Sequence, residues 1–185
     1  MNYHSLPQTY LKLEVPIYQG AQWFVQLRQA LDVARFKTRW QRGHFHITAV
    51  FLNDDKHIDQ LTHAFGQCLK NSVAPTITLD KLGAFVTSNN QIIVNITSSK
   101  PSKELMSLID ELRESARQVD ANMDNRDFQL HITLGRIKVP SVYLKDVQTI
   151  LSGIEIPAFT LKLDNAEYRY RGPKSIRKWK IEEKS

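Results

Sequence analysis

The sequence predicts an α+β protein with two pseudo-symmetric lobes, each an antiparallel-rich sheet with helices on its outer face. Segments with strand and helix periodicity follow one another in the same order twice along the chain. The tripeptide His-Ile-Thr also occurs once in each half, at residues 46–48 and 131–133, inside a segment of strand periodicity. We therefore expect one bilobal domain over residues 1–185 with an internal duplication, lobe 1 at about 1–88 and lobe 2 at about 89–185. An active groove is expected between the two sheets.

Each half of the chain follows the order strand, helix, strand, helix, strand. Strands are expected where apolar and polar residues alternate, and helices where apolar residues recur at helical spacing. In the first half the expected elements are a strand at 10–16, a helix at 20–34, a strand at 44–52, a helix capped by Asp54 or Asp55, and a strand at 75–86. In the second half they are a strand at 91–97, a helix that begins after Ser99, a strand at 128–139, a short helix at 141–151, and strands at 156–170 and 176–181.

The composition is that of a soluble globular protein, with 42% hydrophobic and 24% charged residues. No apolar stretch approaches the roughly 20 residues that span a bilayer, so no membrane partner is expected. The N-terminal residues lack the basic and apolar segments of a secretory signal. The single cysteine, Cys68, excludes an internal disulfide and is compatible with a reducing compartment. These features together predict a cytoplasmic protein.

The net charge of +6 and the isoelectric point near 9.4 favour anionic partners. The excess is concentrated in residues 169–180, which hold many lysines and arginines and no acidic residue. This segment is either a solvated basic tail or a rim that follows the phosphates of a nucleic acid, with aromatic residues available for base stacking. Charge alone does not distinguish the two interpretations.

Strand alternation separates the polar residues of the two His-Ile-Thr segments from their apolar neighbours. In the first copy the polar face holds His44, His46 and Thr48, and the apolar face holds Phe45, Ile47, Ala49 and Phe51. In the second copy His131 and Thr133 share one face, and Leu130, Ile132 and Leu134 share the other. Strict alternation places Arg136 on the apolar side, where a packing or edge role is as plausible as a phosphate contact.

A histidine and a threonine on the same face in both halves suit acid/base chemistry at phosphorus. The ordinary pKa of imidazole is about 6.5, so at neutral pH one ring can accept a proton while another donates one. Two such rings on opposite sides of a phosphodiester can activate an attacking hydroxyl and protonate the leaving oxygen. A threonine hydroxyl can donate to a non-bridging phosphate oxygen and stabilise the transition state. This chemistry requires no metal.

The segments HITAVFLN and RDFQLHITLGRI resemble the two H-x-T/S signatures of the two-histidine (2H) phosphoesterase superfamily. That superfamily includes bacterial 2'-5' RNA ligase-like and RNA 2',3'-cyclic phosphodiesterase proteins, and the resemblance covers roughly residues 36–182. It implies catalytic roles for His46 and His131 and phosphate-binding roles for Thr48 and Thr133, without a cofactor. The implied activity is a metal-independent phosphodiesterase that opens a 2',3'-cyclic or 2'-5' phosphodiester of RNA or of a small cyclic nucleotide.

The chain departs from many RNA-directed members of that superfamily at two places. Ala49 and Val50 stand where an arginine is frequent, and Leu130 stands where a proline is frequent. Further substrate contacts are expected from four residues. These are His44 at the rim, Arg126 in the groove, Tyr168, and Arg171 in the basic segment. For Tyr168 the alternative to stacking on a base is packing in the core or at a sheet edge, and packing is the preferred interpretation.

Two other functions stay open at this point. A non-catalytic RNA- or nucleotide-binding module would keep the groove and the basic segment but would turn nothing over. A metal-dependent hydrolase would use His44 and His46, whose H-x-H spacing on a strand is common among metal ligands. Because no H-x-x-E or C-x-x-C partner accompanies them, we expect no metal site. The sequence leaves open the natural substrate, which can be an RNA end, a cyclic mononucleotide or an ADP-ribose cyclic phosphate. It also leaves open which histidine is the acid and whether hydrolysis or ligation is preferred. The oligomeric state and any protein partner cannot be inferred from it.

Overall fold

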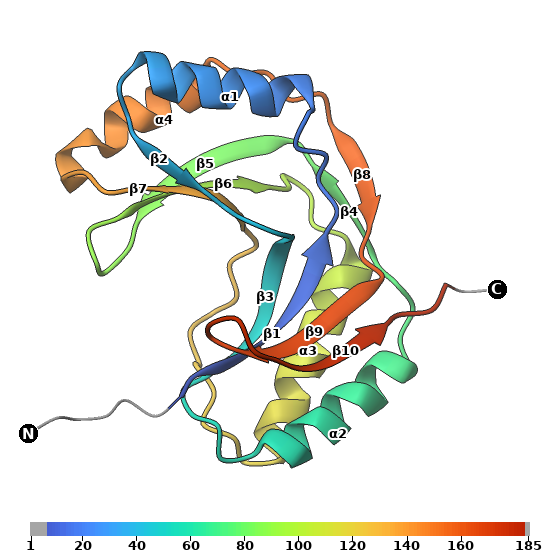
Figure 1. Cartoon of the computed structure of the whole chain (residues 1–185). Helices are drawn as coiled ribbons and strands as arrows, with labels where there is room; N and C mark the ends of the chain where they lie inside the picture. Colours follow the sequence, from blue (N-terminus) through green and yellow to red (C-terminus); the bar gives the residue numbers. More distant parts are fainter. Residues whose placement is uncertain (1–6, 184–185) are drawn as a thin grey trace, which may run out of the picture.

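The structure, a computed structural model, describes residues 7–183 (Figure 1). Its helices are α1 (Gln22–Val33), α2 (Ile58–Lys70), α3 (Lys103–Gln118) and α4 (Leu144–Ser152), and a short 3-10 helix, η1 (Ser141–Tyr143), precedes α4. Its strands are β1 (Thr9–Val15), β2 (Thr38–Trp40), β3 (Phe45–Leu52), β4 (Thr76–Leu79), β5 (Lys81–Val86), β6 (Ile92–Thr97), β7 (Ile132–Ile137), β8 (Phe159–Lys162), β9 (Asn165–Tyr170) and β10 (Ser175–Lys180). None of the helices in this part of the chain is long and apolar enough to cross a membrane.

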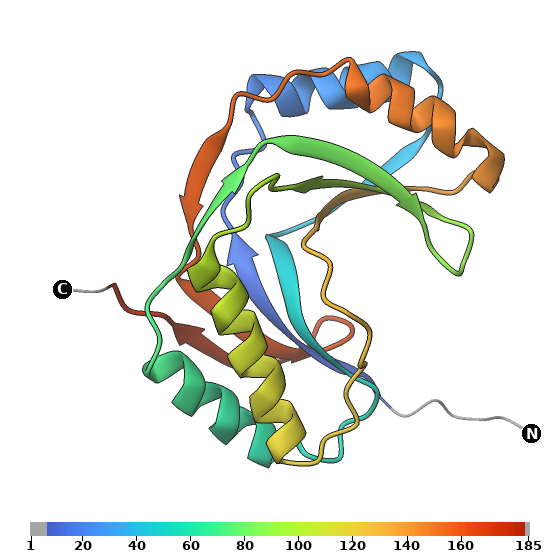
Figure 2. The same ribbon diagram turned by 180° about the vertical axis from the view of Figure 1, so that it is seen from behind.

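The strands form two four-stranded antiparallel sheets. The β1 sheet has the order β10-β9-β1-β3, and the β6 sheet has the order β2-β7-β6-β5. Helices α2 and α3 cover the outer face of the β1 sheet, and α1 and α4 cover the outer face of the β6 sheet (Figures 1 and 2). The small β4–β8 sheet lies along one side, between the two larger sheets. The α+β fold with two lobes and outer helices is therefore confirmed.

The lobes do not correspond to the two halves of the sequence, so the predicted division at about residue 88 is wrong. Strands β9 and β10, from the second half, complete the β1 sheet, and strands β2 and β5, from the first half, complete the β6 sheet. The helices cross in the same way, because α1 follows β1 but packs beside α4, and α3 follows β6 but packs beside α2. Each repeat therefore contributes strands and helices to both lobes.

The apolar periodicity of the helices corresponds to the faces that they bury. Helix α1 buries Trp23, Phe24, Leu27 and Leu31, and α3 buries Leu105, Leu108, Ile109, Leu112 and Ala116. Ser102 caps α3, since its side chain accepts a hydrogen bond from the Leu105 amide at 3.2 Å. The buried apolar residues of both lobes form one continuous cluster. Because that cluster passes through both lobes, it holds the two sheets in a fixed relation.

Candidate active site

A cavity of about 860 Å³ opens between the β1 sheet and the β6 sheet. Its lining includes Thr48 from β3, Thr133 from β7 and His131 immediately before β7. The remaining walls come from β5, β6, α3 and the loop between α3 and β7. The volume is within the range of roughly 300–1,000 Å³ that is usual for ligand sites. Residues of both His-Ile-Thr segments thus meet at one cavity, although His46 is not among the residues that line it.

Both motif-bearing strands contain a β-bulge directly after the threonine. In β3 the partners of Lys12 and Leu11 are Thr48 and Val50, so Ala49 is the extra residue. In β7 the partners of Asn95 and Val94 are Thr133 and Gly135, so Leu134 is the extra residue. A bulge interrupts the alternation of faces and redirects the side chains that follow it.

The bulges correct two sequence-based assignments. Phe51 and Arg136, both expected on the apolar face, are half-buried residues that line the cavity together with the threonines. The signal that could have located Arg136 was a charged residue next to Gly135 in an otherwise apolar strand. Phe51 also stacks on Tyr10 of β1, with ring centroids 6.5 Å apart and an angle of 18° between the planes.

His46 is largely buried near the beginning of β3. Burial lowers the pKa of its imidazole from 6.5 to about 4, and the nearby positive charge of Lys12 acts in the same direction. Smaller contributions come from Arg169 and from His131, which lies close enough for its charge to act on His46. The Tyr10 ring lies 5.9 Å from the imidazole, centroid to centroid. His46 is therefore neutral at pH 7.

His131 is oriented by its own loop. Its Nδ1 atom lies 2.9 Å from the carbonyl oxygen of Gln129. Because a carbonyl only accepts, Nδ1 carries the proton in this hydrogen bond, and Nε2 is left for the substrate. The edge of the ring also packs against Phe85 of β5, with centroids 5.3 Å apart at 88°. These two contacts fix the ring at the wall of the cavity.

A buried ion-pair network lies beside His46 and Thr48 on the β1 sheet. The Lys12 ammonium is 3.4 Å and the Arg169 guanidinium is 3.2 Å from the same carboxylate oxygen of Glu167, and the Lys12 and Glu167 side chains are 7% and 6% exposed. Burial alone would raise the pKa of Glu167, but a hydrogen bond from Ser175 and the two neighbouring cations hold that pKa below its usual value. The network places positive charge next to the neutral His46. In the β6 sheet the buried Asn95 is the cross-strand partner of Thr133, as Lys12 is of Thr48 in the β1 sheet.

Arg136 is the cation that faces the cavity from the β6 sheet. It forms no salt bridge with any residue in the range 7–183, and its cross-strand neighbour on β2 is another cation, Arg39. Burial, the charge of Arg39 and the charge of Arg171 all lower the pKa of the Arg136 guanidinium, which nevertheless stays protonated. The groove thus contains a charged donor that no carboxylate neutralises.

The loop that precedes β7 brings Arg126 to the cavity, as predicted. The Arg113 guanidinium of α3 holds this loop through hydrogen bonds to the carbonyl oxygens of Asp124 at 3.2 Å and Arg126 at 2.6 Å. Arg126 itself pairs with the Asp124 carboxylate at 2.6 Å, and this pairing lowers the pKa of Asp124. Arg126 therefore lines the groove as one half of an ion pair and not as a free cation.

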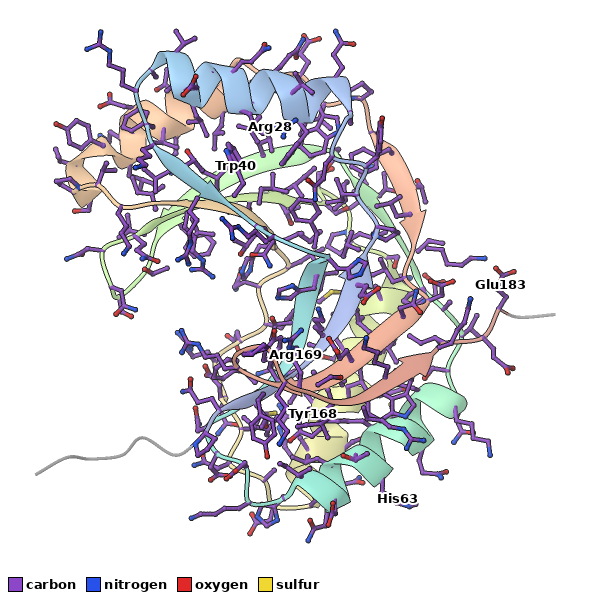
Figure 3. All side chains as sticks on the ribbon, in the orientation of Figure 1. Arg28, Trp40, His63, Tyr168, Arg169 and Glu183 are labelled. Carbon is purple, nitrogen blue, oxygen red and sulfur yellow. The ribbon has the colours of Figure 1, made fainter. Side chains whose placement is uncertain are left out.

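The structure does not bring the other three candidate contacts into the cavity. Tyr168 is fully buried on the helix side of β9, packs against Phe65 and shares a 2.8 Å hydrogen bond with Thr9, whereas Arg169 lies on the opposite face (Figure 3). Burial raises the pKa of Tyr168 to about 12, and base stacking by this ring is excluded. His44 is exposed just before β3, and Arg171 is exposed after β9, where it donates to Gln8 at 2.8 Å.

The fold is shared with several solved structures of low sequence identity. E. coli LigT complexed with 3'-AMP superposes with a TM-score of 0.58 at 19% identity, over 95% of this chain and 98% of that one. TT0787 of Thermus thermophilus gives 0.63 at 14% identity, over 96% and 100%. The PDE domain of MHV ns2 gives 0.59 at 12% identity, over 92% and 99%.

The sequence itself matches a family model, described as the 2'-5' RNA ligase superfamily, over residues 16–165. No curated protein matches the chain. The matched region contains both His-Ile-Thr segments and both walls of the cavity, and it agrees with the resemblance to the 2H phosphoesterases. The chain therefore belongs to the 2'-5' RNA ligase superfamily.

Proposed function

We propose that this protein is a metal-independent phosphodiesterase that opens a 2',3'-cyclic or 2'-5' phosphodiester of RNA or of a nucleotide. The observation that supports this most strongly is the meeting of Thr48, His131 and Thr133 at one cavity, beside a second histidine that burial keeps neutral. Membership of a superfamily of phosphoesterases supports the reaction class. The LigT complex with 3'-AMP, in which a protein of the same fold binds a nucleotide, supports the substrate class.

In the hydrolytic direction His46 acts as the general base and His131 as the general acid. His46 removes a proton from a water molecule, whose oxygen forms a bond to phosphorus. The bond between phosphorus and one ribose oxygen breaks, and His131 protonates that oxygen as it leaves. A 2',3'-cyclic phosphate thereby becomes a phosphomonoester with a free neighbouring hydroxyl. Ligation would follow the same sequence with the hydroxyl of a second nucleotide in place of water, so that its oxygen bonds to phosphorus as one ribose oxygen of the cyclic phosphate leaves and is protonated.

This division of roles follows from the environments of the two rings. A base must be neutral when the substrate binds, and the lowered pKa of His46 meets that condition throughout the physiological range. An acid must present a proton to the leaving oxygen. Because the Nδ1 proton of His131 is donated to Gln129, His131 would enter this step as the imidazolium, with the Nε2 proton directed at the leaving oxygen. The hydroxyls of Thr48 and Thr133 and the guanidinium of Arg136 would hold the non-bridging oxygens, whose negative charge increases in the transition state.

Treatment with EDTA followed by an assay on a 2',3'-cyclic mononucleotide and a 2'-5'-linked dinucleotide tests the proposal. We expect full activity on at least one of the two after chelation. Loss of activity with EDTA and recovery with a divalent metal would instead support the metal-dependent alternative. Binding of the nucleotide without turnover would support the non-catalytic module.

A cytoplasmic location is part of the proposal, supported by the single free cysteine, Cys68.

A further inference from the structure

A second hollow, of about 680 Å³, runs along β2 at the outer edge of the β6 sheet. Four exposed cations line it and are here named the β2-edge patch: Lys37, Arg39, Arg42 and Lys138. Its other lining residues are neutral except for Arg136, and no carboxylate is among them. The hollow is therefore a purely basic surface on an edge strand.

The pairing of β2 with β7 places like charges directly opposite one another. Arg39 is the cross-strand partner of Arg136, and Lys37 and Lys138 extend the two strands beyond the Thr38–Ile137 pair. Like charges in such positions destabilise a sheet. No member of the patch forms a salt bridge within residues 7–183. In the basic segment Arg169 pairs with Glu167 and Lys180 with Asp164, and the remaining cations there are also without a salt bridge but line neither hollow. The patch thus retains its full positive charge, and a bound anion would relieve the repulsion.

The patch is continuous with the active groove through Arg136, which lines both cavities. Trp40 turns toward α1 and packs on Phe24 with ring centroids 5.5 Å apart (Figure 3), so the neighbouring Arg39 lies on the face that Arg136 shares. At about 3.3 Å per residue, the segment from Lys37 to Arg42 extends roughly 15 Å, which is longer than one phosphate group. A chain of phosphates that leaves the groove at Arg136 would meet this row of cations next.

We propose that the β2-edge patch binds the backbone phosphates of a single-stranded RNA whose reactive phosphodiester lies in the groove. The inference rests on the proposed function and narrows its substrate class from any nucleotide to an oligoribonucleotide. Lysine and arginine side chains bind phosphates without regard to base sequence. The affinity that the patch provides therefore increases with the length of the RNA and does not depend on its sequence.

The triple variant Lys37→Gln, Arg39→Gln, Arg42→Gln tests this proposal with two substrates, uridine 2',3'-cyclic phosphate and an oligouridine that ends in the same cyclic phosphate. For the oligonucleotide we expect KM to rise at least about tenfold. The slope of log affinity against log salt should become shallower by roughly 0.7 for each phosphate that the variant no longer neutralises. For the mononucleotide kcat/KM should change by less than about twofold, because its one phosphate lies in the groove.

A matched control removes three exposed cations from the outer helices, as Lys70→Gln, Lys103→Gln, Lys145→Gln. It carries the same loss of charge and should behave as wild type on both substrates. Equal losses on the two substrates in the β2-edge variant, or equal losses on the oligonucleotide in both variants, would overturn the proposal. If the triple variant does not fold by circular dichroism, the single changes Lys37→Gln and Arg42→Gln replace it.

The failure of this inference and the failure of the proposed function give different results. If the wild-type protein hydrolyses neither substrate, the proposed function is wrong, and the patch is tested by fluorescence anisotropy of a labelled oligouridine with a 3'-phosphate. Binding at least about tenfold weaker in the β2-edge variant than in the control variant would support the patch. Equal binding by the two variants would refute it.

Discussion

Phe51 in β3 and Arg136 in β7 occupy equivalent positions after the two His-Ile-Thr segments but have opposite chemistry. Each lies beyond the bulge of its strand, is half-buried between two buried residues and lines the same cavity. The groove is therefore asymmetric, with Phe51, which stacks on Tyr10, on one side and a cation on the other. Under the proposed function, the aromatic side would contact the base of a nucleotide and the cation would contact its phosphate.

Arg136 should contribute directly to turnover. Among the guanidinium groups that line the groove within residues 7–183, Arg126 is paired with a carboxylate and Arg113 with backbone carbonyls, which leaves Arg136 free for the substrate. In Arg136→Gln, kcat on a cyclic mononucleotide should fall roughly 10²-fold, as when one transition-state donor is removed. Steady-state kinetics measure the effect, with Phe51→Leu, which should act mainly through KM, as the comparison at the equivalent position. A normal kcat in Arg136→Gln would show that the guanidinium does not contact the reacting phosphate.

The acid limb of the pH–rate profile should follow His46. Since its pKa is lowered to about 4, kcat/KM should stay high down to pH 5 and fall only as His46 is protonated near pH 4. Lys12→Met removes one positive charge that lowers this pKa, so the acid limb should move to higher pH. The measurement is a kcat/KM profile of both proteins in buffers of constant ionic strength. An acid limb at the same pH in the two proteins would show that the Lys12 charge does not act on the base.

The same pKa makes the stability of the protein depend on pH. The pKa of His46 is about 4 in the folded state, against about 6.5 for an unfolded chain, so the unfolded state takes up its proton first as the pH falls. The contribution of His46 to the free energy of unfolding is complete above pH 6.5 and is lost between pH 6.5 and 4, by about 3 kcal/mol in total. Urea titrations across this range measure it. His46→Gln should abolish this part of the pH dependence, and an unchanged dependence would contradict the assignment.

Gly135 is required for the edge strand to lie against β7. A Cβ at this position would approach Thr38 Cγ2 to 2.8 Å and the Trp40 ring to 2.9 Å, so Gly135→Ala should lower the free energy of unfolding by about 1–3 kcal/mol. Thermal unfolding measures this. The control is Gly153→Ala at the end of α4, where the nearest atom lies at 3.5 Å and little change is expected. Equal stability of the two variants would mean that β2 can shift without cost.

Strand alternation was sufficient to predict the shared faces of His46 with Thr48 and of His131 with Thr133, because no bulge precedes the threonines. It failed for Phe51 and Arg136, because a bulge depends on the pairing of two strands and not on the sequence of one. The exchange of strands between the lobes was missed for the same reason. Local periodicity predicts that β9 is a strand, but its partner β1 is far away in the sequence.

Local sequence patterns could not predict two other features of the fold. Strand β2 has only three residues and was not predicted, because its formation depends on the space that Gly135 leaves on β7. The basic segment 169–180 contains parts of the two strands expected at 156–170 and 176–181, but local patterns did not show that they pair as the β9–β10 hairpin, in which Arg169 and Lys180 have acidic partners. Lys174, Arg177 and Lys178 of this segment have no acidic partner within residues 7–183, but they line neither hollow, whereas the unpaired cations beside the groove lie on and around β2.

The central claim, that His46 and His131 form the acid/base pair, is tested most directly by turnover of a 2',3'-cyclic mononucleotide in His46→Gln, His131→Ala and His63→Ala. His63 is exposed on α2, away from the groove (Figure 3), and serves as the matched control. The first two variants should fold and bind the nucleotide but lose at least about 10²-fold in kcat, as expected when a general acid or base is removed, while His63→Ala keeps wild-type kcat. Wild-type turnover in a folded His131→Ala or His46→Gln variant would contradict the account.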